Sequence, residues 1–231
     1  MKRQLFIVHG WAYSVEPWQQ TISELAARDI DVTMLNVPGL TSPSNDVWTI
    51  DDYVAWLDTQ LEGTEQPIVL GHSNGGRIAM HYAVAHPSRL QQLILLASAG
   101  VEVKTERLSL KRRALRLASK LLAPLKHIPY VKKIVYRILK SDYNNAPENM
   151  KQTLTNMLAS DHDFDPSSIT TPTVILNGEN DRVTPPAMAK KLHTAIPNST
   201  LRIVSEWEHA PYRTHPVELA SEIVAALEQE R

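Results

Sequence analysis

The chain has 231 residues, of which 43% are hydrophobic and 21% charged, and a formal net charge of −1. This composition predicts one globular domain, or a domain with an insertion, and excludes disordered, collagen-like and coiled-coil proteins. The absence of cysteine excludes a disulfide scaffold, cysteine-ligated metal sites and a cysteine nucleophile.

No segment has the length of a membrane span. The longest nearly apolar stretch covers residues 93–101, which is far too short to cross a bilayer. Lys2 and Arg3 begin the chain as a signal peptide would, but only four consecutive apolar residues precede His9. Four residues are too few for the hydrophobic region of a signal peptide. We therefore expect a cytoplasmic protein with no transmembrane segment.

Short apolar strands alternate with longer helical patterns along the chain. This alternation predicts an α/β fold, in which a parallel sheet is covered by helices on both faces. The predicted strands cover residues 5–8, 32–35, 67–70, 93–96, 173–176 and 201–204. The predicted helices cover residues 17–28, 50–61, about 76–86, 185–195 and 216–229. Thr49 and Asp52 resemble the capping box of the second helix.

One helical insertion interrupts the predicted sheet. Residues 101–168 carry helical patterns without strand signals, so we expect the core to consist of residues 1–100 and 169–231. Residues 101–140 hold twelve Lys and Arg and only two Glu, a charge of +10, so the other 191 residues sum to −11. A basic face of this kind suits an anionic substrate or partner.

The sharpest chemical motif is Gly71-His72-Ser73-Asn74-Gly75, followed by Gly76. It stands between a predicted strand and a predicted helix, as a nucleophile elbow does. Such a turn holds the serine in a strained backbone conformation and projects its hydroxyl from the end of the sheet, and glycines flank it because a Cβ would clash. Ser73 is therefore the candidate nucleophile.

A serine nucleophile needs a base, and the base needs an acid to orient it. After histidines in helices and in the insertion are set aside, and His72 because its side chain is expected to point away, His9, His209 and His215 remain. His209 follows the last predicted strand, whereas His215 directly precedes Pro216 at the start of a helix and is the weaker candidate. Asp181 follows the preceding strand. Ser73, Asp181 and His209 thus come in the order Ser, Asp, His at the carboxyl ends of strands.

This arrangement resembles the α/β-hydrolase fold superfamily over nearly the whole chain. The motifs that carry the resemblance are His9-Gly10-Trp11, Gly71 to Gly76, Gly178-x-x-Asp181-x-x-x-Pro185, and His209-Ala210-Pro211 with Pro216 behind it. The resemblance implies that the backbone N–H groups of Trp11 and Asn74 form an oxyanion hole and that His9 is a structural member of its loop. It also implies that residues 101–168 are a cap above the site. No cofactor or metal is expected.

The chain departs from the family pattern at two places. It starts at what resembles the family's third strand, so we expect about six strands and no leading hairpin. Glu208 stands where the family usually has a glycine before the catalytic histidine. A carboxylate close to the His209 ring would raise the pKa of that ring.

The resemblance implies a serine hydrolase that cleaves small carboxylic esters through an acyl-enzyme. The alternatives within the superfamily are a carbon–carbon bond hydrolase of the meta-cleavage type, a thioesterase, a lactonase and a carrier-protein ester hydrolase. A non-catalytic receptor on the same scaffold is an alternative from another class. Fold alone does not separate these functions.

The sequence does not identify what the basic segment 101–140 contacts. This segment would be a solvated cap face, or it would meet an anionic substrate, an acidic acyl carrier protein or a phospholipid surface. Nucleic acid is not expected, because the positive charge lies over the predicted catalytic pocket and no nucleic-acid-binding motif accompanies it.

Overall fold

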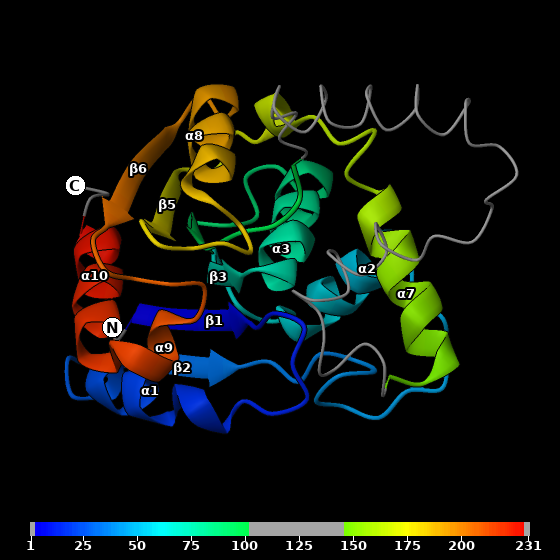
Figure 1. Ribbon diagram of the computed structural model, residues 1–231, viewed down its shortest axis with the longest axis horizontal. Helices are drawn as coiled ribbons and strands as arrows, with labels where there is room; N and C mark the ends of the chain where they lie inside the picture. Colours follow the sequence, from blue (N-terminus) through cyan, green and yellow to red (C-terminus); the bar gives the residue numbers. More distant parts are fainter. Residues whose placement is uncertain (1–2, 102–145, 229–231) are drawn as a thin grey trace, which may run out of the picture.

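The computed structural model describes residues 3–101 and 146–228. Its centre is one sheet with all strands parallel, in the order β2-β1-β3-β4-β5-β6 (Figure 1). The strands are β1 (Arg3–Val8), β2 (Ile30–Met34), β3 (Ile68–His72), β4 (Gln92–Leu96), β5 (Thr173–Gly178) and β6 (Ser199–Val204). The predicted α/β fold with six strands is confirmed.

Helices cover both faces of the sheet (Figure 1). One face carries α1 (Gln19–Ala26) and α10 (Pro216–Glu228), which pack against each other. The other face carries α2 (Ile50–Gln60), α3 (Asn74–Ala85) and α8 (Pro186–Ala195). Beyond α2 and α3 in Figure 1 lies α7 (Glu148–Ala159).

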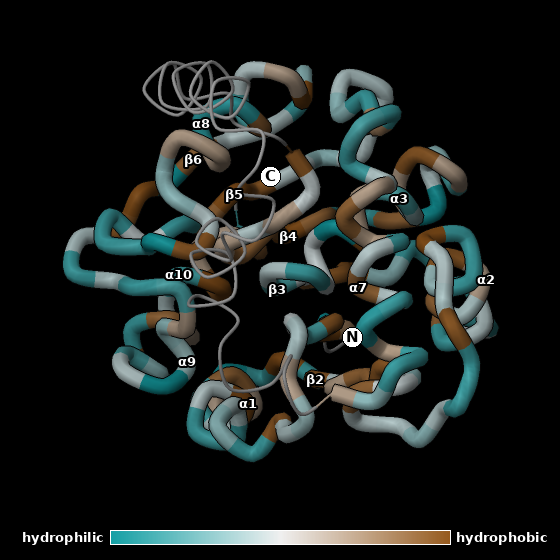
Figure 2. The backbone as a smooth tube through the Cα atoms, turned by 45° about the vertical axis from the view of Figure 1, so that its right-hand side comes forward, coloured by the Kyte–Doolittle hydropathy of each residue, from teal (hydrophilic) through white to brown (hydrophobic). Residues whose placement is uncertain are grey.

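Apolar side chains alternate between the two faces along each strand. In β1, Leu5 and Ile7 belong to the core under α1 and α10, whereas Phe6 and Val8 belong to the core under α2 and α3. Successive side chains of a strand point to opposite faces, so a strand covered on both faces needs an unbroken apolar run. In Figure 2, β4 is correspondingly hydrophobic in the interior of the molecule.

Helix ends follow local sequence signals. Thr49 begins α2 with a capping box, because its hydroxyl accepts the N–H of Asp52 and the Asp52 carboxylate accepts the N–H of Thr49. The predicted helix over 17–28 is divided, since a 3₁₀ turn (Glu16–Trp18) containing Pro17 precedes α1. A short helix that the sequence analysis did not predict, α9 (Pro211–Thr214), follows His209.

The predicted division of the chain at residues 101–168 stays a prediction, because residues 102–145, with most of the basic segment, lie outside the described residues. The described remainder holds α7 and a 3₁₀ turn (Pro166–Ser168). Within residues 3–101 and 146–228, no helix is long and apolar enough to cross a membrane.

Candidate active site

Ser73 occupies a strained turn between β3 and α3. Its backbone has φ 52° and ψ −116°, in a region that residues with a Cβ seldom adopt. Two glycines make the turn possible. A Cβ on Gly71 would lie 2.5 Å from Cα of Gly76, and one on Gly75 would lie 2.0 Å from the carbonyl oxygen of Val8. The turn has the geometry of a nucleophile elbow.

The loop after β6 folds back over the end of β5. The N–H of Asn180 donates to the carbonyl of Trp207 over 2.9 Å, and a Cβ on Gly178 would lie 2.2 Å from that same oxygen. Trp207 is fully buried. Two strands, β4 and β5, separate β3 from β6, so this return path is what brings His209 toward Ser73.

The structure brings Ser73, His209 and Asp181 together. Nε2 of His209 lies 3.0 Å from Oγ of Ser73, and Nδ1 of His209 lies 2.9 Å from Oδ2 of Asp181. A carboxylate only accepts hydrogen bonds, so the neutral ring donates Nδ1–H to Asp181 and leaves Nε2 free to accept the serine proton. The side chain of Asp181 has no exposed surface, whereas that of His209 is 22% exposed.

The buried Asp181 carboxylate has donors at both oxygens. Oδ1 accepts the N–H groups of Val183 and Thr184 over 2.7 and 2.9 Å, and Oδ2 accepts the Thr184 hydroxyl over 2.7 Å. Burial alone would raise the pKa of Asp181. The hydrogen bond from His209, the positive charge that this ring gains when protonated, and the bonds from Thr184 outweigh burial and hold that pKa below its ordinary value. Asp181 is therefore ionised at neutral pH.

His72 contacts the backbone of His209, a relationship that the sequence analysis missed. Nε2 of His72 donates to the carbonyl oxygen of His209 over 2.9 Å. Trp18 and Tyr212 pack against the His72 ring edge to face. Burial lowers the pKa of His72 to about 3, so the ring is neutral. The local sequence contains no signal for this contact beyond the presence of a histidine before Ser73.

Trp11 and Asn74 belong to two segments that meet at Ser73. Asn74 is the first residue of α3, and Trp11 follows Gly10, where an added Cβ would lie 3.0 Å from Cβ of Ser73. His9 is buried, with Nδ1 2.7 Å from the carbonyl oxygen of Gly10 and Nε2 2.7 Å from the Thr41 hydroxyl. The ring of His9 thus bonds its own loop through Gly10 and the loop after β2 through Thr41.

Neither His215 nor Glu208, which the sequence also singled out, is hydrogen-bonded to Ser73. Nδ1 of His215 contacts the hydroxyl of its neighbour Thr214 over 2.8 Å. The side chain of Glu208 is exposed. Within the described ranges, no three His, Asp or Glu side chains are grouped as metal ligands would be.

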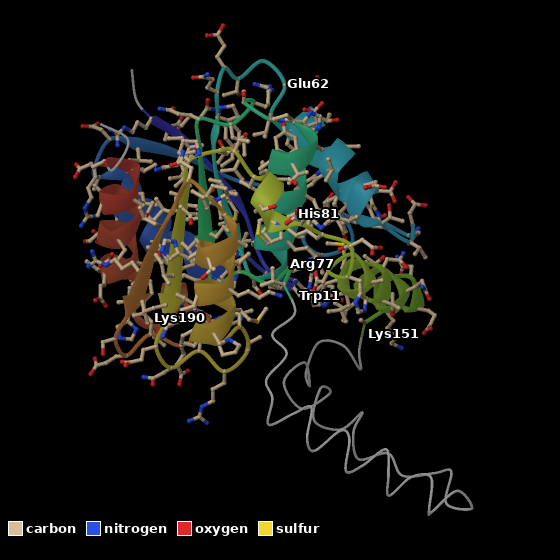
Figure 3. The ribbon with its side chains drawn as sticks, turned by 90° about the horizontal axis from the view of Figure 1, so that it is seen from above. Trp11, Glu62, Arg77, His81, Lys151 and Lys190 are labelled. Atoms are coloured by element: carbon tan, nitrogen blue, oxygen red, sulfur yellow. The ribbon has the colours of Figure 1, made fainter. Side chains whose placement is uncertain are left out.

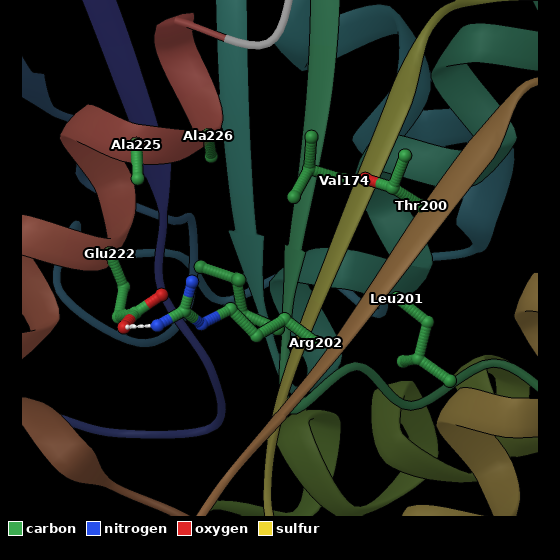
Figure 4. A pocket seen from close by; sticks show the side chains of 8 residues that line it. Val174, Thr200, Leu201, Arg202, Glu222, Ala225 and Ala226 are labelled. Carbon is green, nitrogen blue, oxygen red and sulfur yellow. Dashed lines mark ion pairs between the residues drawn. The ribbon is translucent and has the colours of Figure 1, made fainter.

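A cavity of about 250 Å³ lies away from this site, between β5, β6 and α10 (Figure 4). Apolar side chains such as Val174 and Ala226 line it, and Nη2 of Arg202 pairs with Oε1 of Glu222 over 2.5 Å at its edge. Neither Ser73 nor His209 lines it, so it is not the candidate active site.

The described elbow, acid and histidine lie at the carboxyl end of a parallel sheet, which is the arrangement of the α/β hydrolases. A family model described as the alpha/beta hydrolase fold matches residues 4–216. The chain belongs to the α/β-hydrolase fold family.

Curated relatives extend over almost the whole chain. A pimeloyl-[acyl-carrier protein] methyl ester esterase of Neisseria meningitidis is 24% identical over 92% of this chain and 89% of its own length. The protein of the same name from Vibrio parahaemolyticus is 24% identical over 95% of this chain and 92% of its own length.

Solved structures share the fold. An alpha/beta hydrolase from the metagenome of lagoon sediments of Mar Chica, Morocco, has a TM-score of 0.73 at 22% identity and covers 99% of this chain and 92% of its own. A serine hydrolase involved in carbazole degradation has a TM-score of 0.69 at 21% identity and covers 100% and 92%.

Proposed function

We propose that this protein hydrolyses carboxylic esters, with Ser73 as nucleophile, His209 as general base and acid, and Asp181 as the group that orients His209. The observation that carries the proposal is the unbroken contact from Ser73 Oγ through the His209 ring to Asp181, at 3.0 and 2.9 Å. A serine hydroxyl becomes an effective nucleophile when a positioned base takes its proton.

The reaction proceeds in two halves. Ser73 Oγ attacks the ester carbonyl carbon while Nε2 of His209 takes the hydroxyl proton, and Asp181 stabilises the resulting imidazolium. The tetrahedral intermediate collapses, the C–O bond to the alcohol breaks, and His209 gives the proton to the leaving oxygen. Water then repeats the sequence on the acyl-enzyme, which releases the acid and restores Ser73.

The backbone N–H groups of Trp11 and Asn74 are the proposed oxyanion hole. The position of Asn74 at the start of α3 supports this role, as does the close approach of the Gly10 loop to Ser73. A donor in such a position stabilises the transition state by about 3 kcal/mol.

The first experiment is hydrolysis of p-nitrophenyl esters from acetate to palmitate, with the Ser73→Ala variant as control. We expect hydrolysis by the natural chain and its loss in Ser73→Ala, and the chain-length profile would measure the acyl pocket. Undiminished hydrolysis by Ser73→Ala would overturn the proposal. Labelling of Ser73 by a fluorophosphonate separates an active enzyme from a receptor with an unreactive serine.

A second candidate function is the hydrolysis of an ester whose acyl group is attached to an acyl carrier protein. The names of the relatives support it, and so does the charge of +10 in residues 101–140, because acyl carrier proteins are acidic. We expect pimeloyl-carrier-protein methyl ester to be hydrolysed with a higher kcat/KM than free monomethyl pimelate, by a margin that shrinks as salt is added. Equal kcat/KM values for the two substrates would reject this candidate.

A further inference from the structure

A buried arginine lies one helical turn beyond the nucleophile. Arg77 belongs to α3 and is 3% exposed. Its backbone N–H donates to the backbone carbonyl oxygen of Ser73 over 3.4 Å. Its guanidinium Nε and Nη2 donate to the two carboxylate oxygens of Asp161 over 2.6 and 2.9 Å. Nη1 donates to Oδ1 of Asn74.

Each group in this cluster restrains the others. A buried guanidinium is costly unless its charge is paired and its N–H groups are bonded, so Arg77 holds a defined position between Asp161 and Asn74. Its planar fork matches both oxygens of a carboxylate, which fixes orientation as well as distance. Nη1, the guanidinium nitrogen that does not bind Asp161, therefore sets where the side chain of Asn74 lies on the first turn of α3.

Asp161 comes from a different part of the chain. It follows α7 in the segment that leads back to β5, and 84 positions separate it from Arg77. One turn further along α3, the ring centroids of His81 and Phe164 are 4.2 Å apart, and Phe164 belongs to the same segment as Asp161. Arg77 and His81 follow one another along α3 (Figure 3). The segment at 161–164 is thus held on α3 at two consecutive turns.

We propose that Arg77 is a positioning residue for the oxyanion hole. By clamping Asn74 to Asp161, it keeps the first turn of α3, and with it the Asn74 N–H, in one place relative to Ser73. The segment after α7 thereby becomes part of the support of the active site. This inference rests on the proposed function, because it assigns Asn74 to the oxyanion hole of ester hydrolysis.

The test compares Arg77→Met, Asp161→Asn and the double variant on a short neutral ester, p-nitrophenyl acetate. We expect each single variant to lower kcat about tenfold while KM changes less than about threefold, because the oxyanion interaction is made in the transition state. The rate of Ser73 labelling by a fluorophosphonate should fall by a similar factor. The double variant should be no slower than Arg77→Met, since both changes remove the same contact.

Two matched variants separate positioning from general stability and from charge. Arg89 donates to the carbonyls of Thr64 and Leu61 over 2.5 and 2.8 Å, away from Ser73, so Arg89→Met should lower the melting temperature and leave kcat unchanged. Arg77→Lys should not restore kcat, because an ammonium lacks the fork.

A folded Arg77→Met with normal kcat and labelling would overturn the inference, and so would full activity in Arg77→Lys. A rise in kcat in Asp161→Asn would also overturn it, because that result would mean that net charge, not position, governs the oxyanion. If Arg77→Met fails to fold, Asp161→Asn alone decides. Failure of the proposed function gives a different result, namely undiminished hydrolysis in Ser73→Ala.

Discussion

Nε2 of His72 lies 2.9 Å from the backbone carbonyl oxygen of His209, although 137 positions separate the two residues in the chain. The bond joins the end of β3, which carries Ser73, to the loop that carries His209. It acts on the backbone of His209 and leaves both nitrogens of the His209 ring for Ser73 and Asp181.

Removal of this donor is expected to slow the enzyme. His72→Leu leaves the partly buried carbonyl of His209 without its hydrogen bond, which costs about 1 kcal/mol and loosens the loop. We expect kcat to fall about tenfold, and less in His72→Gln, whose amide keeps a donor. Steady-state kinetics on a p-nitrophenyl ester measure both variants. Equal rates for His72→Leu and the natural chain would contradict the prediction.

The same residue makes stability depend on pH. His72 has a pKa of about 3 in the folded state and about 6.5 when unfolded. Below pH 6.5 the unfolded chain therefore binds a proton that the folded chain does not. As the pH falls from about 6 to about 3, we expect His72 to lower the free energy of unfolding by about 1.4 kcal/mol per pH unit. Above pH 7 the His72 ring is neutral in both states, so it causes no such loss.

Urea unfolding at pH 7, 6, 5 and 4 measures this dependence. His72→Gln is the control, because an amide does not titrate, and its stability should fall less steeply with acid than that of the natural chain. Parallel curves for the two proteins would show that His72 titrates alike in the folded and unfolded states.

Asp181→Asn tests the orientation of the base. The amide keeps the volume of the carboxylate but removes the charge that stabilises the imidazolium, and its NH₂ group favours the wrong tautomer of His209. We expect kcat to fall by about 10⁴ on the same p-nitrophenyl ester. Circular dichroism should show an unchanged fold. A loss of less than about tenfold would remove Asp181 from the proposed mechanism.

Thr184 supports Asp181 through its hydroxyl. Oγ1 of Thr184 lies 2.7 Å from Oδ2 of Asp181 and 2.9 Å from the carbonyl oxygen of Ala97. Thr184→Val keeps the shape and removes the hydroxyl, so the Asp181 carboxylate is held less firmly. We expect kcat to fall about fivefold to tenfold, which corresponds to about 1 kcal/mol, the net contribution of one ordinary hydrogen bond. Thr184→Ser keeps the hydroxyl and should retain most of the activity.

Local sequence determined the sheet and the strained turn that carries Ser73. The apolar runs of the strands have to be buried on both faces, and a Gly-x-Ser-x-Gly-Gly turn between strand and helix has few backbone solutions, so these features are readable from neighbouring residues. The choice of Asp181 and His209 followed from their places at strand ends, because the carboxyl ends of parallel strands share one edge.

Only the tertiary structure decided which distant groups meet. The contact of His72 with His209, the return of the loop over Gly178, and the clamp of Arg77 on Asp161 and Asn74 each join segments that are far apart in the chain. Such pairs depend on how loops pack over the end of the sheet, and hydrophobic periodicity contains no information on that packing. Arg77 in the sequence is one polar residue of a helix, and its burial against Asp161 became visible only when α3 and the segment after α7 were placed side by side.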